Sequence, residues 1–166
     1  MAGWNDFFVA MGGASVAFAG LVLVSISINL DRIVRQPGLV GRAAVPLIVL
    51  FTLFVSASVI LIPGQRTWFY GLELLIVVAA FAVVAGIVLG RQRDEARRTT
   101  QQGLTPRRSF LIRVMLCAVT ASFLLLAGIV LLFGRTGGAY FLAPAMIVGF
   151  LLAFLEAWVL LIEIDR

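Results

Sequence analysis

The stretch FFVAMGGASVAFAGLVLVSISINL, residues 7–30, carries no charged side chain, and the first charge after it is Asp31. About 20 consecutive apolar residues in an α-helix cross the roughly 30 Å hydrocarbon core of a bilayer. The stretch therefore predicts a membrane-spanning helix. Its many glycine, alanine and serine residues bury little surface, so their purpose must be sought in how helices pack.

The rest of the chain repeats this apolar pattern. Of its 166 residues, 62% are hydrophobic and only 13% are charged, a balance typical of integral membrane proteins and not of soluble domains. Further apolar runs of spanning length occupy residues 43–63, 68–90, 109–133 and 139–162. We therefore predict an all-α integral membrane protein, a five-transmembrane-helix bundle that forms one membrane domain over residues 1–166. Pro46 is expected in the opening turn of the second span, where the missing N–H of proline costs little.

The distribution of arginine predicts the orientation of the bundle. All thirteen basic residues are arginine, and only Arg66 and Arg135 fall in the short connections after the second and fourth spans. The other eleven lie in the connections 31–42 and 91–108, at the start of the fourth span, or at the C-terminus. Cytoplasmic connections are enriched in arginine and lysine. We therefore expect cytoplasmic loops at 31–42 and 91–108, with the N-terminus outside and the C-terminus in the cytoplasm.

The first span is expected to stay in the mature protein. A cleaved signal needs a basic segment before its apolar run, and the opening residues MAGWND contain only the acidic Asp6. Cys117 is the single cysteine and lies within the fourth span, so no disulfide can form within the chain.

Small side chains recur on one face of two spans at steps of three and four residues, which place them along one side of a helix. In the first span this face, which we name the N-terminal seam, consists of Ala10, Gly13, Ala17 and Gly20. In the fifth span the corresponding C-terminal seam consists of Ala145, Gly149, Ala153 and Ala157. The third span has a shorter set, Ala82, Gly86 and Gly90. Helices associate in a bilayer where small side chains let their backbones approach, so each seam is expected either to pack within the bundle or to contact a second copy or a partner membrane protein.

Acidic side chains within the spans need partners, because a charge near the middle of a bilayer costs at least about 2.5 kcal/mol. Glu156 lies about 9 Å inside the fifth span. Arg113 enters the fourth span to a similar depth from the same side and is the expected partner. Asn29 and Asp31, at the inner end of the first span, are expected to complete this polar cluster.

Glu73 lies near the opposite end of the third span, where Arg66 and Arg135 could extend toward it. Two interpretations of Glu73 and Glu156 remain open. Each is either a paired charge that fixes the register of helices or a proton or cation site within the membrane.

The connection 91–108 carries a dense arginine cluster that suits anionic lipid headgroups at the cytoplasmic face. The lipid-headgroup candidates are Arg91, Arg93, Arg97, Arg98, Arg107 and Arg108. The alternative is that these arginines only determine topology. Nucleic acid is not an expected partner, because no folded module presents the charges.

The composition argues against catalysis. The chain has no histidine and no lysine, so the commonest general base, imidazole metal ligands and Schiff-base chemistry are absent. Ser15 and Cys117 have no nearby base in the sequence. We therefore expect no enzyme activity, no metal and no cofactor.

These features favour a non-enzymatic polytopic protein of a bacterial-type cytoplasmic membrane. Its expected role is that of a helix-packing subunit or modulator, which forms a homo-oligomer or docks on another membrane protein through a small-residue face. The alternative is a small oligomeric channel or transporter for ions or protons that uses the intramembrane carboxylates.

Overall fold

The computed structural model describes residues 2–35, 39–99 and 107–164, and the side chains of these residues except 2, 32, 39, 94–99, 107–110 and 160–164. Throughout these ranges the secondary structure is helical, with no strand. The long helices are α1 (Asn5–Ile28), α3 (Leu39–Leu61), α4 (Thr67–Thr99), α5 (Arg107–Leu132) and α6 (Ala139–Ile164). Within the described ranges, five helices are long and apolar enough to cross a membrane. The short elements are η1 (Ala2–Trp4), α2 (Leu30–Arg35) and η3 (Thr136–Gly138).

Each long helix coincides with one predicted span, but the boundaries differ at one end of the bundle. The connection expected at 31–42 contains α2 and the first residues of α3, and α4 continues to Thr99 through much of the connection expected at 91–108. Pro46 was expected in an opening turn. Because α3 already begins at Leu39, Pro46 instead lies two turns inside that helix, where it is buried.

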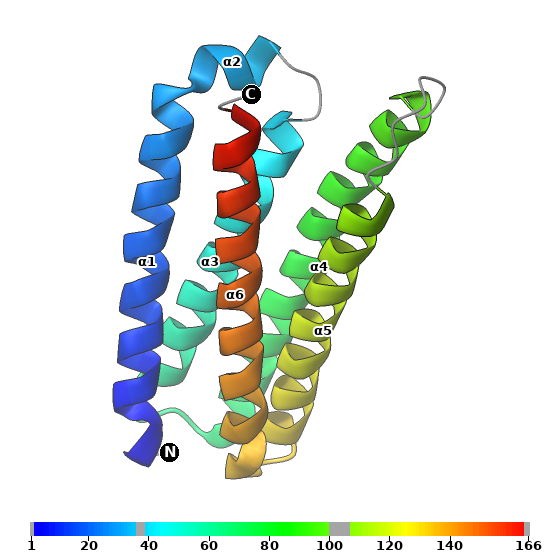
Figure 1. Cartoon of the computed structure of the whole chain (residues 1–166). Coiled ribbons are helices and arrows are strands. Elements are labelled where there is room, and N and C mark those ends of the chain that lie inside the picture. Colours follow the sequence, from blue (N-terminus) through cyan, green and yellow to red (C-terminus); the bar gives the residue numbers. More distant parts are fainter. Residues whose placement is uncertain (1, 36–38, 100–106, 165–166) are drawn as a thin grey trace.

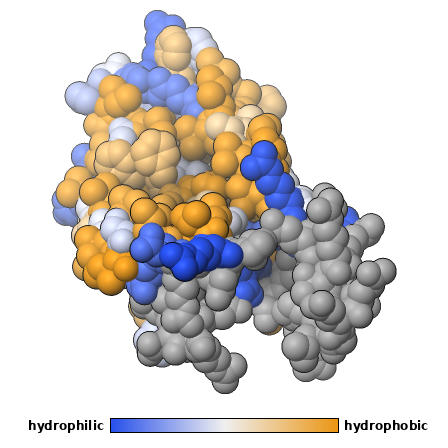
Figure 2. All heavy atoms as spheres, turned by 90° about the horizontal axis from the view of Figure 1, so that it is seen from above, coloured by the Kyte–Doolittle hydropathy of each residue, from blue (hydrophilic) through white to orange (hydrophobic). Residues whose placement is uncertain are grey.

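The helices run alternately up and down, so that the start of α1 and the end of α6 lie at opposite ends of the bundle (Figure 1). We call one end the short-turn end, because residues 62–66 and 133–138 connect the helices there. We call the other the long-connection end, where α2 lies and where α4 ends and α5 begins (Figure 1). Figure 2 looks onto the long-connection end and shows hydrophobic residues over much of the described surface, with hydrophilic residues between them.

A glycine in a left-handed conformation makes each tight turn possible. Gly64, between α3 and α4, has a φ of 80°, and Gly134, between α5 and α6, has a φ of 75°. Residues with a Cβ rarely adopt such angles. The two turns therefore depend on glycine for their short length.

The core of the bundle is built around α3 and α6. Half of the membrane-length segment of each is buried, against 22% for α1 and 17% for α4. α3 packs against α1, α4 and α6, and α5 packs against α4 and α6. The helices α3 to α6 therefore form a four-helix bundle, to which α1 is added along α3.

Aromatic side chains hold α1 against α6. At the short-turn end the ring centroids of Trp4 and Tyr140 lie 5.1 Å apart in an edge-to-face arrangement. Further along α1, the ring of Phe18 lies 5.6 Å from that of Phe150 and 5.9 Å from that of Phe154. Such pairs add to the packing energy of the rings, and they fix the position of α1 at two levels of the bundle.

The helices α4 and α5 approach each other closely at two glycines. A Cβ built on Gly71 would lie 2.6 Å from the Cα of Leu132 and 2.8 Å from the carbonyl oxygen of Gly128. A Cβ built on Gly128 would in turn lie 2.9 Å from Leu75 Cδ2. The backbones therefore touch at a point that only glycine permits, as in other membrane helix pairs.

Candidate functional site

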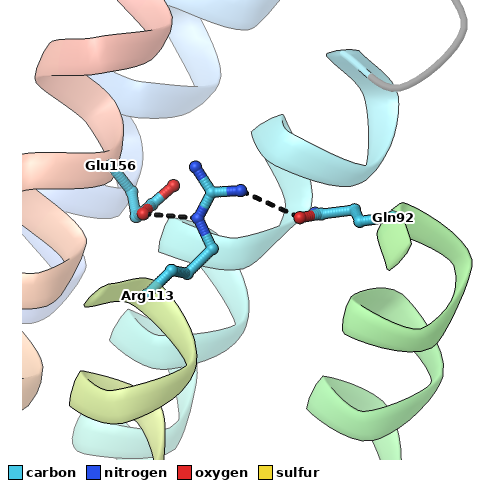
Figure 3. Close-up of polar contacts among 3 residues, drawn as sticks. All are labelled: Gln92, Arg113 and Glu156. Atoms are coloured by element: carbon cyan, nitrogen blue, oxygen red, sulfur yellow. Dashed lines mark hydrogen bonds and ion pairs between the residues drawn. The ribbon is translucent and has the colours of Figure 1, made fainter. Parts of the chain in front are cut away.

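A buried polar cluster joins three helices at the long-connection end. Arg113 of α5 donates from Nε to Oε1 of Glu156 on α6, at 2.6 Å, and from Nη1 to Oε1 of Gln92 on α4, at 2.9 Å (Figure 3). All three residues are more than nine-tenths buried. The expected pairing of Arg113 with Glu156 is present, and two hydrogen bonds, one of them to the opposite charge, stabilise the buried guanidinium.

Gln92 is the member of the cluster that the sequence did not suggest. Its amide oxygen accepts from Arg113, while its Nε2 is buried without a hydrogen-bond partner. That nitrogen faces α3, where a Cβ built on Gly41 would lie 3.3 Å from it. The cluster therefore occupies a space bordered by four helices, and the small size of Gly41 leaves room for the glutamine amide.

The two other residues expected in this cluster lie elsewhere. Asn29 donates from Nδ2 to the carbonyl oxygen of Ser25 in its own helix, at 3.0 Å. Asp31 is exposed on α2. The expectation failed because α1 packs along α3 and not beside α5, so the end of α1 is not next to Arg113.

Glu73 has a neutral partner. Nε2 of Gln65 donates to Oε1 of Glu73 at 3.3 Å, and Oε2 of Glu73 is buried without a partner. Arg66 and Arg135, the partners expected from the sequence, have exposed side chains. Gln65 lies in the short turn directly before α4, and it reaches the carboxylate from there.

The described interior between the two ends is mostly apolar, with a few buried hydroxyl groups. One turn beyond Arg113 along α5 lies the buried thiol of Cys117, followed by Thr120, whose hydroxyl is buried without a partner. Beyond these, the buried side chains include Leu124, Leu131 and Leu142. Among the described buried side chains, the only charged ones are therefore Arg113 and Glu156, and the other buried polar groups are neutral.

Most hydroxyl groups in the helices are bonded within their own helix. Ser15, Thr52 and Ser56 each donate to the carbonyl oxygen four residues earlier, at 2.7–2.8 Å. Ser25, Ser27, Ser58 and Ser122 do the same at 2.7–3.0 Å. Such bonds satisfy a hydroxyl in an apolar environment without water.

The C-terminal seam lies inside the bundle. Ala145, Gly149, Ala153 and Ala157 are all buried. A Cβ built on Gly149 would lie 3.0 Å from Leu53 on α3 and 3.1 Å from Thr120 on α5. This seam lets α6 approach both neighbours.

The N-terminal seam lies outside. Ala10, Gly13, Ala17 and Gly20 are exposed, and nothing lies within 4 Å of a Cβ built on Gly13 or Gly20. The face of α1 that packs against the bundle instead contains Phe8, Gly12, Ser15 and Val22. The short set on α4 is also outward, since Ala82, Gly86 and Gly90 are exposed.

Two of the six lipid-headgroup candidates have described side chains. Arg91 and Arg93 are both exposed near the end of α4. Arg97, Arg98, Arg107 and Arg108 lie outside the described side chains.

No group of three or more histidine, cysteine, aspartate or glutamate residues that could hold a metal ion occurs in the part of the chain that the structure describes. Comparison of the chain with protein-family models, with curated proteins and with solved structures finds no match.

Proposed function

We propose that the chain is a non-enzymatic membrane subunit that associates through the N-terminal seam with a second copy or with a partner membrane protein. One observation carries the proposal: Gly13 and Gly20 form an exposed small-residue face that no part of the described chain covers. The close packing within the chain is made by other glycines, among them Gly71, Gly128 and Gly149. The N-terminal seam is therefore not needed to fold the bundle, and its geometry suits close approach by another helix.

The buried cluster supports a structural role in this proposal. Glu156 is held by Arg113, which also binds Gln92, so the carboxylate is already paired inside one copy. A paired charge of this kind ties helices together and is a poor exchange site for a mobile ion. We assign the cluster to holding α4, α5 and α6 in register.

The proposed setting is a bacterial-type cytoplasmic membrane, with the long-connection end on the cytoplasmic side. The positive-inside rule supports this orientation, because eleven of the thirteen arginines fall in the predicted connections 31–42 and 91–108, at the start of the fourth span or after the fifth span in the sequence. Six of them would contact anionic headgroups there: Arg91, Arg93, Arg97, Arg98, Arg107 and Arg108.

The proposal is tested by the mass of the protein in mild detergent. The wild type is expected to be larger than one 17.9 kDa chain, and a variant with Gly13→Leu and Gly20→Leu is expected to fall to the mass of a single chain or to lose its partner. Ala118→Leu is the control, because Ala118 is also exposed but lies on α5, away from the N-terminal seam. An unchanged mass in the double variant would exclude the N-terminal seam as the contact.

The alternative function, an oligomeric ion or proton channel, is separated by a flux assay. Protein reconstituted in liposomes is expected to carry no proton or cation flux. A flux that Glu156→Gln or Glu73→Gln abolishes would overturn the proposal in favour of the channel.

A further inference from the structure

A long groove lies on the outside of the bundle between α1 and α4. Both helices pack on α3, which separates them and forms the floor of the groove. The groove has a volume of about 820 Å³. A space of this size open to the side of a membrane bundle needs an occupant.

The lining of the groove suits a hydrocarbon chain. Its floor includes Phe51 and Phe54, and its walls include Val16 from α1 and Ala80 and Val84 from α4. These side chains offer only apolar contact, so an occupant of the groove is held by dispersion attraction to them.

The hydroxyl groups in the groove are already used. Ser15 donates to the carbonyl oxygen of Met11 at 2.7 Å, and Thr52 donates to that of Ile48 at 2.8 Å. Neither hydroxyl needs a hydrogen bond from the occupant. The occupant can therefore be an acyl chain, which has no hydrogen-bonding group.

A positive charge stands above one wall of the groove. Arg91 follows Val84 by seven residues on α4, which places it on the same face about 11 Å nearer the long-connection end. Its side chain is exposed. Arg93, which is equally exposed, lies more than half a turn around α4 from Arg91 and so points away from this wall.

We propose that the groove binds an acyl chain of an anionic glycerophospholipid whose phosphate contacts Arg91. The charge and the apolar groove lie on one line along the helix, as the head and the tail of a lipid do. A second copy is a poorer occupant, because the floor presents the bulky side chains of Phe51 and Phe54 where a helix would need small ones. The inference depends on insertion in a bilayer and not on association through the N-terminal seam, which shares Gly20 with the groove but has Ala10, Gly13 and Ala17 outside it.

The test uses full-length protein in mild detergent and counts bound lipid by native mass spectrometry after addition of phosphatidylglycerol or phosphatidylcholine. The wild type is expected to retain phosphatidylglycerol and to bind phosphatidylcholine more weakly. Ala80→Phe fills the groove and is expected to remove the bound phosphatidylglycerol. The matched control is Ala82→Phe, because Ala82 is also exposed on α4 but lies more than half a turn from Ala80 and is not part of the lining.

A second pair of variants tests the headgroup contact. Arg91→Gln is expected to weaken phosphatidylglycerol binding about fivefold, the value of one arginine near an anionic surface. Arg93→Gln is the control and is expected to bind as the wild type does.

Three results would overturn the proposal. The first is equal binding of phosphatidylglycerol by wild type and Ala80→Phe, which excludes the groove. The second is an equal loss of phosphatidylglycerol binding in Arg91→Gln and Arg93→Gln, which excludes a specific contact with Arg91. Equal affinity of the wild type for phosphatidylglycerol and phosphatidylcholine would exclude it as well. The third is that Ala80→Phe abolishes a dimer while the amount of bound phosphatidylglycerol stays the same, which assigns the groove to a helix of a second copy. All variants are checked for wild-type helix content. Because Gly20 also lines the groove and Gly13 does not, association and lipid binding are separated with the single variant Gly13→Leu, which is expected to retain phosphatidylglycerol whatever its mass.

Discussion

Arg113 is the residue on which the long-connection end of the bundle depends. Its side chain is 5% exposed, and a charge so placed is tolerated only when strong hydrogen bonds replace water. Glu156 supplies the opposite charge, and Gln92 accepts a second bond from a different helix. The side chain therefore connects three helices while it satisfies its own need for partners.

Glu156→Gln is expected to destabilise the protein by about 3–5 kcal/mol, because it leaves the charge of Arg113 buried without a counter-ion. The measurement is the free energy of unfolding in a titration of mild detergent with sodium dodecyl sulfate. The control is a variant with both Arg113→Met and Glu156→Met, which removes the pair together and is expected to recover most of the loss. Equal destabilisation of the single and double variants would contradict a role of the buried charge.

Among the helices, small residues decide which backbones approach. The periodicity of the sequence locates a stripe of small side chains on a helix, but it does not say which way the stripe faces. Gly12 and Gly13 are adjacent, yet Gly12 is buried, where a built Cβ would lie 3.3 Å from Ala57, and Gly13 is exposed. Gly71 and Gly128, where the backbones of α4 and α5 approach closely, form no repeated pattern and could not be found from spacing.

The same limit explains which parts of the polar cluster could be predicted. The pairing of Arg113 with Glu156 followed from their matching depth in the predicted spans. Gln92 stands in the segment RQRDEARR, which has the composition of an exposed connection. The continuation of α4 through this segment turns Gln92 toward the interior, and only the neighbouring helices determine that direction.

Gly71→Ala is expected to destabilise the α4–α5 pair by about 1–3 kcal/mol, since the added methyl group would meet the backbone of Leu132 and the helices would have to separate. Gly86→Ala on the same helix is the control. Nothing lies within 4 Å of a Cβ at Gly86, and alanine favours a helix over glycine by up to about 1 kcal/mol. The two variants are compared by thermal unfolding in detergent, and a stable Gly71→Ala protein would mean that the helices are not in backbone contact there.

For the whole molecule, the odd number of membrane-length helices in the described chain has a direct consequence. The start of α1 and the end of α6 are at opposite ends of the bundle (Figure 1), so the two ends of the chain should face opposite sides of the membrane. We expect the difference in arginine content between the two ends of the bundle to select one orientation over the other. The helices themselves are compatible with either.

Labelling of single cysteines with a membrane-impermeant maleimide in intact cells tests the orientation. In a Cys117→Ala background, which removes the only cysteine, Gly3→Cys and Arg135→Cys are expected to be labelled from outside because both positions are exposed at the short-turn end. Asp31→Cys, exposed at the long-connection end, is expected to react only after the membrane is opened, and its substitution leaves every arginine in place. Labelling of Asp31→Cys in intact cells, with protection of the other two, would reverse the orientation. It would also move the proposed lipid contact of Arg91 to the outer leaflet, because the groove and this arginine belong to the same end of α4.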